Sequence, residues 1–307
     1  MLFSSVRSGF LLGIINLHKP TGKTSHDMVS LVRRTLGLKR VGHTGTLDPE
    51  ASGVLPVLVG KATGLSEMLT EKTKGYTARV RLGIATDTYD LAGVITGRSD
   101  VIPAEEEIKA AAKAFIGRIS QLPPMYSAIK QNGKKLYELA RQGIEVEREA
   151  REVEIYDLRC YDFSGDEFSL DVTCSKGTYI RSLCYDLGRA LGTYATMASL
   201  VRTKSGIFTL ENAITPEELV EKVESGGPEA VLLPPEVVLE GFPAIDVPSE
   251  MAARVKNGLR YRTGQLGIPD AKEGERYRLY ENGNLFCLSK VVPGEGSLVL
   301  ANEVGFY

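Results

Sequence analysis

One short stretch of the chain combines an acid, a histidine and turn-forming residues. Residues 42–49 read GHTGTLDP, which places Asp48 in a loop-like segment with His43 five residues before it. Gly45 permits backbone conformations closed to other residues, and Pro49 fixes the turn after the acid. An Asp-Pro pair also commonly begins a helix or a turn. A carboxylate on such a loop is nevertheless available for chemistry, so Asp48 is a candidate catalytic residue.

Other chemistries that the sequence could support lack a necessary feature. Residues 22–24 (GKT) resemble the end of a phosphate-binding loop, but the motif needs glycine where the chain has Leu17. The glycines of 42–45 lack the spacing of a dinucleotide fingerprint. No histidine pair has the His-x-x-x-His spacing, so we expect no metal site. For acid–base work by two carboxylates, Asp87 and Asp90 stay possible partners of the loop acid.

The charge of the chain is unevenly distributed. A net charge of −2 argues against a protein that coats nucleic acid indiscriminately. Between His18 and Leu47, however, one acid accompanies six basic residues, a net charge of +5; the basic residues are Lys19, Lys23, Arg33, Arg34, Lys39 and Arg40. Residues 211–250 instead carry ten acids and one base. A polyanion that reaches Asp48 would need local neutralisation, so the basic segment is a candidate RNA track.

Length, cysteine usage and hydropathy bound the class of protein. A chain of 307 residues can bury a large core and should hold more than one domain. Its four cysteines form no Cys-x-x-Cys pair, which is typical of reduced packing residues in a cytosolic protein. The apolar run 10–17 is too short to cross a membrane and reads as a buried strand. We therefore expect a cytoplasmic protein that does not span a membrane.

The spacing of apolar residues predicts the elements on either side of the candidate loop. A strand at 11–17 precedes a helix that Ser25 caps and Gly37 ends. After the loop, residues 54–59 should form a short apolar strand. Pro56 within it should place this strand near a sheet edge or a bulge, because proline donates no ladder hydrogen bond.

The remaining sequence predicts strands and helices without regular alternation. Residues 76–82 alternate cleanly between apolar and polar, and 123–150 open with two prolines and look like a surface insertion with a short helix at 134–142. Further elements are expected at 104–116 (helix), 153–160 and 168–174 (strands), and from 178 (helix). Because strands outnumber helices, the predicted class is α+β around a mainly antiparallel sheet.

A composition change divides the chain. Residues 225–248 are rich in glycine and proline, which marks a boundary. Beyond it, Asn282-Gly283 between apolar segments is a strong hairpin signal, and Pro293-Gly294 should turn the chain into a last strand. We expect a catalytic domain over 1–243, with its insertion at about 123–150, and a small β-barrel over 244–307.

Several sequence blocks, in order along nearly the whole chain, extend the Asp48 motif. They are NLHKPTGKTSHDMV, GHTGTLDPEASGVLPVLVGKAT, KGYTARVRLGIATDTYDLAG, QLPPMYSAIKQNGKKLYELARQG, SKGTYIRSLCYDLGRALG and ASLVRTKSGIF. Together these blocks resemble the TruB-type tRNA pseudouridine synthases. The resemblance implies the pseudouridine synthase fold and a C-terminal barrel that is similar to a PUA domain.

The resemblance also implies roles that the local patterns would not assign. Asp48 would be the essential carboxylate and Arg181 its ion-pair partner. Tyr76 would stack on the target uracil and assist proton transfer, and Leu200 would pack against the base. His43 would wedge into the RNA where the uridine is extruded. Neighbours that bind RNA or shape the site would be Lys19, Tyr179 and Lys176. By pattern alone, Tyr76 and Leu200 would be core residues and Arg181 a solvated helix residue.

The implied chemistry needs no cofactor. Uridine becomes pseudouridine when the N1–C1′ bond breaks, the base turns and a C5–C1′ bond forms, without redox change or external group. An ionised carboxylate can start this as a nucleophile or by assisting proton removal at the sugar. A neighbouring Arg181 should lower the pKa of Asp48 and keep it charged at neutral pH.

The resemblance implies that the chain isomerises the T-loop uridine at position 55 of tRNA. That base lies inside a folded loop and must be flipped out, at a cost of a few kcal/mol. We expect a monomer that binds the T-stem-loop without an obligate protein partner, gripping it with the 123–150 insertion and the PUA-like barrel. Two alternatives stay open. One is the catalytic subunit of a guide-RNA-directed pseudouridylation complex, and the other is a non-catalytic tRNA-binding or tRNA-folding protein on the same scaffold.

Overall fold

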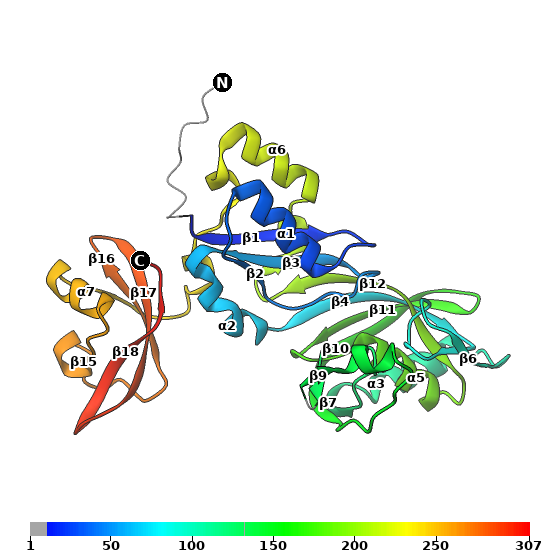
Figure 1. Cartoon of the computed structure of the whole chain (residues 1–307). Helices are drawn as coiled ribbons and strands as arrows, with labels where there is room; N and C mark the ends of the chain where they lie inside the picture. Colours follow the sequence, from blue (N-terminus) through cyan, green and yellow to red (C-terminus); the bar gives the residue numbers. More distant parts are fainter. Residues whose placement is uncertain (1–10, 132) are drawn as a thin grey trace.

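The computed structural model describes residues 11–131 and 133–307, and two sheets organise them (Figure 1). The larger has the strand order β1 (Gly13–Lys19), β3 (Ser52–Val59), β12 (Ala195–Ser205), β4 (Lys74–Leu82), β11 (Glu167–Cys174), β10 (Arg151–Ser164) and β7 (Gly117–Gln121). Two short strands, β2 (Val41–His43) and β13 (Phe208–Thr209), pair with β3 and β12. Only the pairing of β3 with β12 is parallel among the pairs of this sheet. The predicted α+β class with a mainly antiparallel sheet is confirmed.

Different helices cover different parts of this sheet. The hydrophobic core beside β4, β11 and β12 includes residues of α3 (Glu105–Lys113) and α5 (Ile180–Ala190). The core beside β1 and β3 is closed by α1 (Ser25–Leu36) and α6 (Pro216–Gly226). No helix in the described ranges is long and apolar enough to cross a membrane.

The predicted helix after β1 exists, but with a different cap. Thr24 precedes it, and the Thr24 side chain accepts a hydrogen bond from the backbone N–H of Asp27, whose carboxylate caps the Thr24 N–H in return. Gly37 ends the helix in the left-handed region, at φ 66°. Ser25, predicted as the cap, is buried and hydrogen-bonds elsewhere, so that prediction was wrong by one residue.

Strand β3 is internal to the sheet, and the prediction that Pro56 lies near an edge was wrong. It pairs with β1 along its length on one side and with β12 and then β2 on the other. Pro56 falls in the gap between these last two pairings, where its carbonyl accepts a hydrogen bond from the Thr44 N–H (3.2 Å). The missing proline donor therefore removes no ladder hydrogen bond.

The segments between the strands of the large sheet form short helices and two small hairpins. The predicted helix at 104–116 is shorter, because α3 ends at Lys113 and Gly117 (φ 104°) begins β7. A small hairpin pairs β5 (Ile84–Thr86) with β6 (Ile95–Arg98), and α2 (Ser66–Thr70) precedes β4. The 123–150 segment carries β8 (Lys130–Gln131), β9 (Lys134–Lys135) and α4 (Leu136–Ala140).

The second sheet lies at one end of the molecule (Figure 1). Its order is β14 (Ala244–Asp246), β16 (Arg276–Glu281), β17 (Asn284–Gly294), β18 (Ser297–Gly305) and β15 (Tyr261–Arg262), with α7 (Ser249–Lys256) beside it. The predicted hairpin turn at Asn282-Gly283 is confirmed, with φ positive at both residues. The turn expected at Pro293-Gly294 was wrong: β17 continues through both, and the chain reverses after them.

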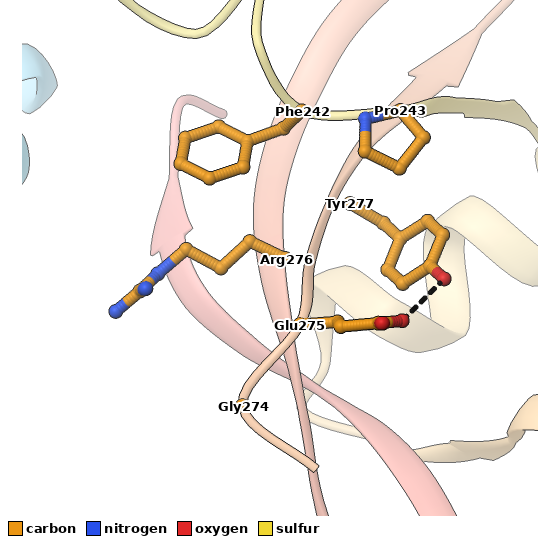
Figure 2. Close-up of a pocket in the computed structure, with 6 residues that line it drawn as sticks. All are labelled: Phe242, Pro243, Gly274, Glu275, Arg276 and Tyr277. Atoms are coloured by element: carbon orange, nitrogen blue, oxygen red, sulfur yellow. Dashed lines mark hydrogen bonds between the residues drawn. The ribbon is translucent and has the colours of Figure 1, made fainter. Parts of the chain in front are cut away.

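A hollow in this second sheet is separate from the candidate site. Figure 2 shows that it is lined by Phe242, Pro243 and residues 274–277. Its one guanidinium, that of Arg276, forms two hydrogen bonds with Glu303, at 2.7 and 2.8 Å. Its carboxylate, that of Glu275, accepts hydrogen bonds from the Lys272 N–H (3.1 Å) and the Tyr277 hydroxyl (3.0 Å). Since both charged groups are hydrogen-bonded within the second sheet, we assign the hollow no chemistry.

Candidate active site

Asp48 lies in the loop between β2 and β3, and side chains from outside the loop hold it in place. The Ser25 Oγ accepts a hydrogen bond from the Leu47 N–H (2.9 Å) and donates to the Leu47 carbonyl (3.2 Å). Immediately after the acid, the Pro49 carbonyl accepts from the N–H of Gly22 (2.9 Å). Both sides of Asp48 are therefore tied to the start of α1 and the turn before it.

Lys19 supports the loop from below. Its side chain is fully buried, and its Nζ donates to the carbonyls of Pro20 (2.9 Å), Lys23 (2.6 Å) and Pro49 (3.1 Å). Burial lowers the pKa of Lys19 to about 8, and the nearby Asp48 carboxylate is the strongest influence that opposes this shift. The Lys19 ammonium therefore holds backbone carbonyls on both the turn after β1 and the Asp48 loop, and it is not exposed on the outer surface.

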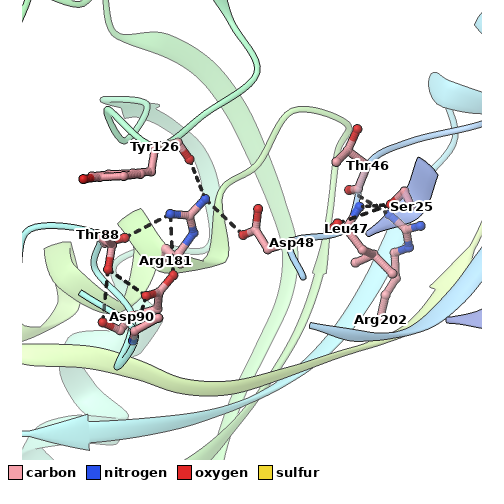
Figure 3. Close-up of polar contacts among 10 residues, drawn as sticks. Ser25, Thr46, Leu47, Asp48, Thr88, Asp90, Tyr126, Arg181 and Arg202 are labelled. Atoms are coloured by element: carbon pink, nitrogen blue, oxygen red, sulfur yellow. Dashed lines mark hydrogen bonds and ion pairs between the residues drawn. The ribbon is translucent and has the colours of Figure 1, made fainter. Parts of the chain in front are cut away.

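Arg202 holds the other side of the loop. This guanidinium, 2% exposed, extends from β12 and donates to the carbonyls of Gly45 (3.2 Å), Thr46 (3.5 Å) and Val54 (2.7 Å). Gly45 has φ 141°, which brings its carbonyl within reach of Arg202 at a position that a side chain would strain. Figure 3 shows Asp48 between this group and a second arginine, Arg181.

Arg181 forms an ion pair with Asp48. Its Nη2 lies 3.0 Å from the Asp48 Oδ2 and donates to the Tyr126 carbonyl at 2.8 Å. Its Nη1 donates to the Thr88 carbonyl (3.0 Å) and lies 3.6 Å from the Asp90 carboxylate (Figure 3). The Arg181 side chain is buried, whereas 41% of the Asp48 side chain is exposed. The arrangement presents a fixed carboxylate at an opening to solvent.

The pKa of Asp48 differs in direction from our expectation. Burial raises it above its usual range, Arg181 opposes that shift, and Asp90 adds to it. The predicted net lowering was therefore wrong, because the cost of placing the carboxylate within the protein exceeds the gain from Arg181. Arg181 is therefore a buried cation that limits the rise in the pKa of Asp48 without reversing it.

Tyr76 and Leu200 lie on neighbouring strands, in contact with the hydrophobic cluster that contains Leu47, the residue before the acid. Tyr76, on β4, is half-buried and packs against the core cluster that contains Leu47 and Leu200. Its cross-strand neighbour on β12 is Arg202. Burial raises the pKa of the Tyr76 hydroxyl, and the Arg202 guanidinium opposes this shift. The hydroxyl is therefore neutral and can donate a hydrogen bond.

His43, Tyr179 and Lys176, the other predicted site residues, each form contacts of their own outside the Asp48–Arg181 pair. The His43 Nδ1 accepts from the Gly45 N–H (3.3 Å), and burial lowers the pKa of His43, which favours the neutral imidazole. Tyr179 precedes α5 and is fixed by two hydrogen bonds between its backbone and Gln121. Lys176 is exposed and forms an ion pair with Glu71 instead of any other candidate.

The two acids considered as partners of Asp48 differ in position. Asp90 is near it through their shared contact with Arg181, whereas Asp87 is exposed and accepts a hydrogen bond from the Val94 N–H (2.8 Å).

Sequence reasoning missed Arg202, although a usable signal existed. It is two residues after the apolar Leu200 and therefore on the same, inward face of a strand.

Comparisons with known proteins identify the family. Residues 33–180 match the TruB family pseudouridylate synthase N-terminal domain, and 181–240 match the tRNA pseudouridylate synthase B C-terminal domain. A relative from Clostridium perfringens named tRNA pseudouridine synthase B is 46% identical over 276 residues, which cover 89% of this chain and 92% of the relative. The chain belongs to the TruB family. Another tRNA pseudouridine synthase B, from Moorella thermoacetica, is 44% identical over 94% of this chain and 97% of its own length.

Solved structures agree with this TruB assignment. The crystal structure of the archaeal box H/ACA sRNP Nop10-Cbf5 complex contains a chain that matches with TM-score 0.71 and 27% identity, over 99% of this chain and 89% of that one. A Cbf5-Nop10-Gar1 complex matches with TM-score 0.73 and 29% identity, over 98% and 86%. The fold prediction is confirmed, and the family makes this chain a pseudouridine synthase.

Proposed function

We propose that this chain isomerises the T-loop uridine at position 55 of tRNA, with Asp48 as the essential carboxylate. The observation that carries the proposal is the Asp48–Arg181 ion pair at 3.0 Å, in which the guanidinium is buried and the carboxylate is partly exposed. The names of the TruB relatives, tRNA pseudouridine synthase B, support tRNA as the substrate.

The residues around Asp48 act one after another in the proposed reaction. The uridine is flipped out of its stack, His43 fills the space that it leaves, and the uracil packs between Tyr76 and Leu200. The Asp48 carboxylate attacks C1′ or assists removal of a proton from the sugar, and the N1–C1′ bond breaks. When the turned base forms the C5–C1′ bond, the bond between Asp48 and C1′ breaks again on the first route, and the sugar regains its proton on the second. After the C5–C1′ bond forms, the proton at C5 leaves and N1 acquires one, so the product is an isomer of the substrate. Tyr76 is the proposed proton carrier.

The rest of the molecule is proposed to bind tRNA outside the reacting base. The 123–150 segment contributes the Tyr126 carbonyl to Arg181, so it reaches the site directly. We assign residues 1–243 to catalysis and 244–307 to a PUA-like RNA-binding domain, which begins with β14. We further propose a cytoplasmic monomer that needs no protein partner, metal or cofactor.

One other function has a specific observation in its favour. One structural neighbour is a chain of an archaeal box H/ACA sRNP complex and another is a chain of a Cbf5-Nop10-Gar1 complex, which supports a catalytic subunit of a guide-RNA-directed complex. The sequence identity to those chains is 27–29%, against 46–48% for relatives named tRNA pseudouridine synthase B. We therefore favour the stand-alone enzyme. Turnover on bare tRNA, without guide RNA or added proteins, distinguishes the two.

The test is mass-spectrometric mapping of unmodified tRNA after incubation with the protein. We expect one new pseudouridine, in the T-loop, and none with Asp48→Asn, because the amide has neither the charge nor the basicity of the carboxylate. Asp157→Asn is the matched control, since Asp157 is an exposed acid of β10 outside the Arg181 contacts. Turnover retained by Asp48→Asn would contradict the proposal. Undiminished tRNA folding by that inactive variant would show an additional non-catalytic role.

A further inference from the structure

Tyr89 has a backbone conformation that a bulky side chain rarely adopts. Its φ is 63°, in the left-handed region, within the turn that joins β5 to β6. Such a residue costs free energy and persists only where the surrounding structure holds it. The two residues beside it, Thr88 and Asp90, are the ones whose carbonyl and carboxylate face Arg181.

The Tyr89 ring is held by α5. It stacks on the ring of Tyr185, with centroids 4.2 Å apart and planes inclined by 19°. Tyr185 follows Arg181 by four residues, so both project from adjacent turns of one helix face. The turn therefore meets α5 at two places, the aromatic stack and the Arg181 contacts.

The remaining contacts of the turn fix Asp90. Its Oδ1 accepts from the Thr88 hydroxyl (2.7 Å) and the Ala92 N–H (3.1 Å), which leaves Oδ2 for Arg181. The Tyr89 carbonyl accepts from the Met197 N–H of β12 (3.1 Å). With the sheet on one side and the stack on the other, the turn has little freedom to move relative to Arg181.

The 123–150 segment also contacts this assembly. Arg148, whose side chain is largely buried, donates to the Pro123 carbonyl (3.1 Å) and pairs with Glu145 (3.2 Å). Burial raises the pKa of Tyr89, Tyr185 adds to that rise, and the Arg148 guanidinium opposes it. The segment meets Arg181 through the Tyr126 carbonyl.

We infer that Tyr89, stacked on Tyr185, is a positioning residue for Arg181. The stack fixes the turn that presents the Thr88 carbonyl and the Asp90 carboxylate, and these orient Arg181 toward Asp48. The inference rests on the proposed function, in which Asp48 acts as an ionised carboxylate. A merely structural stack would hold the β5–β6 hairpin without influencing the titration of Asp48.

The test compares Tyr89→Ala, Tyr89→Gly and Tyr185→Ala in the full-length protein on T-stem-loop RNA. At saturating RNA we expect single-turnover rates about two- to tenfold lower, the range that one lost aromatic pair represents, with RNA affinity nearly unchanged. In a plot of rate against pH, the acidic limb is the range in which the rate falls as Asp48 becomes protonated. This limb should move to higher pH in the variants, because a loosened Arg181 lowers the pKa of Asp48 less. Tyr89→Gly adopts the positive φ without strain, so it carries the test if the alanine variant folds poorly.

Controls separate the stack from other effects. Tyr89→Phe keeps the ring and should retain most of the rate. Tyr156→Ala removes an exposed tyrosine of β10 and should change neither the rate nor its acidic limb. The double variant of Tyr89 and Tyr185 to alanine should be no slower than either single variant, because both remove the same contact.

Three results would overturn the inference: unchanged rates, slower rates with an unmoved acidic limb, or additive losses in the double variant. If the wild-type protein forms pseudouridine and the variants match it, only this inference fails. If the wild-type protein forms none, the proposed function itself fails.

Discussion

At the scale of single residues, the site pairs a partly exposed carboxylate, Asp48, with a buried guanidinium, Arg181. Asp48 alone would be protonated more readily than an exposed aspartate, because burial raises its pKa. Arg181 counters this at 3.0 Å, while Asp90 attracts the same guanidinium and raises the pKa of Asp48 further. Small changes in the position of Arg181 should therefore alter how much of Asp48 is ionised.

Arg181→Met should slow the reaction and change its pH dependence. The variant loses a charge-assisted contact to Asp48, so we expect turnover about 10- to 100-fold lower at neutral pH. The reaction needs the ionised acid, whose population falls as pH decreases through its pKa. Since Arg181 lowers that pKa, its removal should move the acidic limb to higher pH. Single-turnover rates over a pH series measure both effects.

The control for this change is Arg189→Met, which removes an exposed arginine from the last turn of the same helix. It should leave the acidic limb in place. An Arg181→Met protein whose limb matches the wild type would mean that the ion pair does not determine the ionisation of Asp48.

At the scale of elements, the Asp48 loop depends on β12, because Arg202 of that strand holds the Gly45 carbonyl, 157 residues away in sequence. Regular elements near the loop, such as the helix at 25–36 and the alternating strand at 76–82, follow from apolar periodicity and were predicted. The loop's support by Arg202 was not. The position of Arg202 two residues after Leu200 indicates the inward face of β12, but only the tertiary structure shows that three carbonyls satisfy this guanidinium.

The same limit applies to Lys19 and Pro56. Charge along the chain does not reveal that Lys19 is buried, because the loop that covers it, with the Pro49 carbonyl, is 30 residues away in sequence. Proline propensity does not reveal that Pro56 faces a gap between two partner strands. Local pattern thus predicted the elements, and the resemblance supplied the site residues. Their mutual support depends on contacts distant in sequence.

Arg202→Met should destabilise the fold and loosen the loop. It leaves the carbonyls of Gly45 and Val54 buried without their donor, at a cost of about 2–4 kcal/mol in the free energy of unfolding. Urea unfolding measures this loss. Turnover should also fall at temperatures where the variant is fully folded, because Asp48 is then held less firmly.

Two further variants make this test specific. Arg202→Lys keeps the charge and one donor group, so it should recover part of both losses. Arg159→Met removes an exposed ion pair on β10 and should change the free energy of unfolding by less than about 1 kcal/mol. If Arg202→Met were as stable and as active as Arg159→Met, the proposed support of the loop would be wrong.

At the scale of the whole molecule, the two sheets share a hydrophobic core. Ile14 and Leu58 of the large sheet belong to the same buried cluster as Leu288 and Val304 of the small one. β3 is therefore covered on both faces, by α1 and α6 on one and by the small sheet on the other. The second sheet is fixed relative to the Asp48 loop, so RNA bound to it would have a defined position at the site.

The affinity for tRNA should fall steeply with salt. Of the six basic residues between His18 and Leu47, Lys19 is buried, whereas Lys23, Lys39 and two arginines are exposed. Each exposed charge that meets a phosphate releases counterions, which lowers the slope of log affinity against log salt by about 0.7–0.9. Lys23→Gln and Lys39→Gln should therefore weaken binding and make the slope shallower, each by about one contact. Lys222→Gln, in the acidic segment, is the exposed control and should change neither the affinity nor the slope.

Filter binding of tRNA across a salt series gives both the affinity and the slope. A wild-type affinity that stays constant from low to moderate salt would place the RNA track elsewhere.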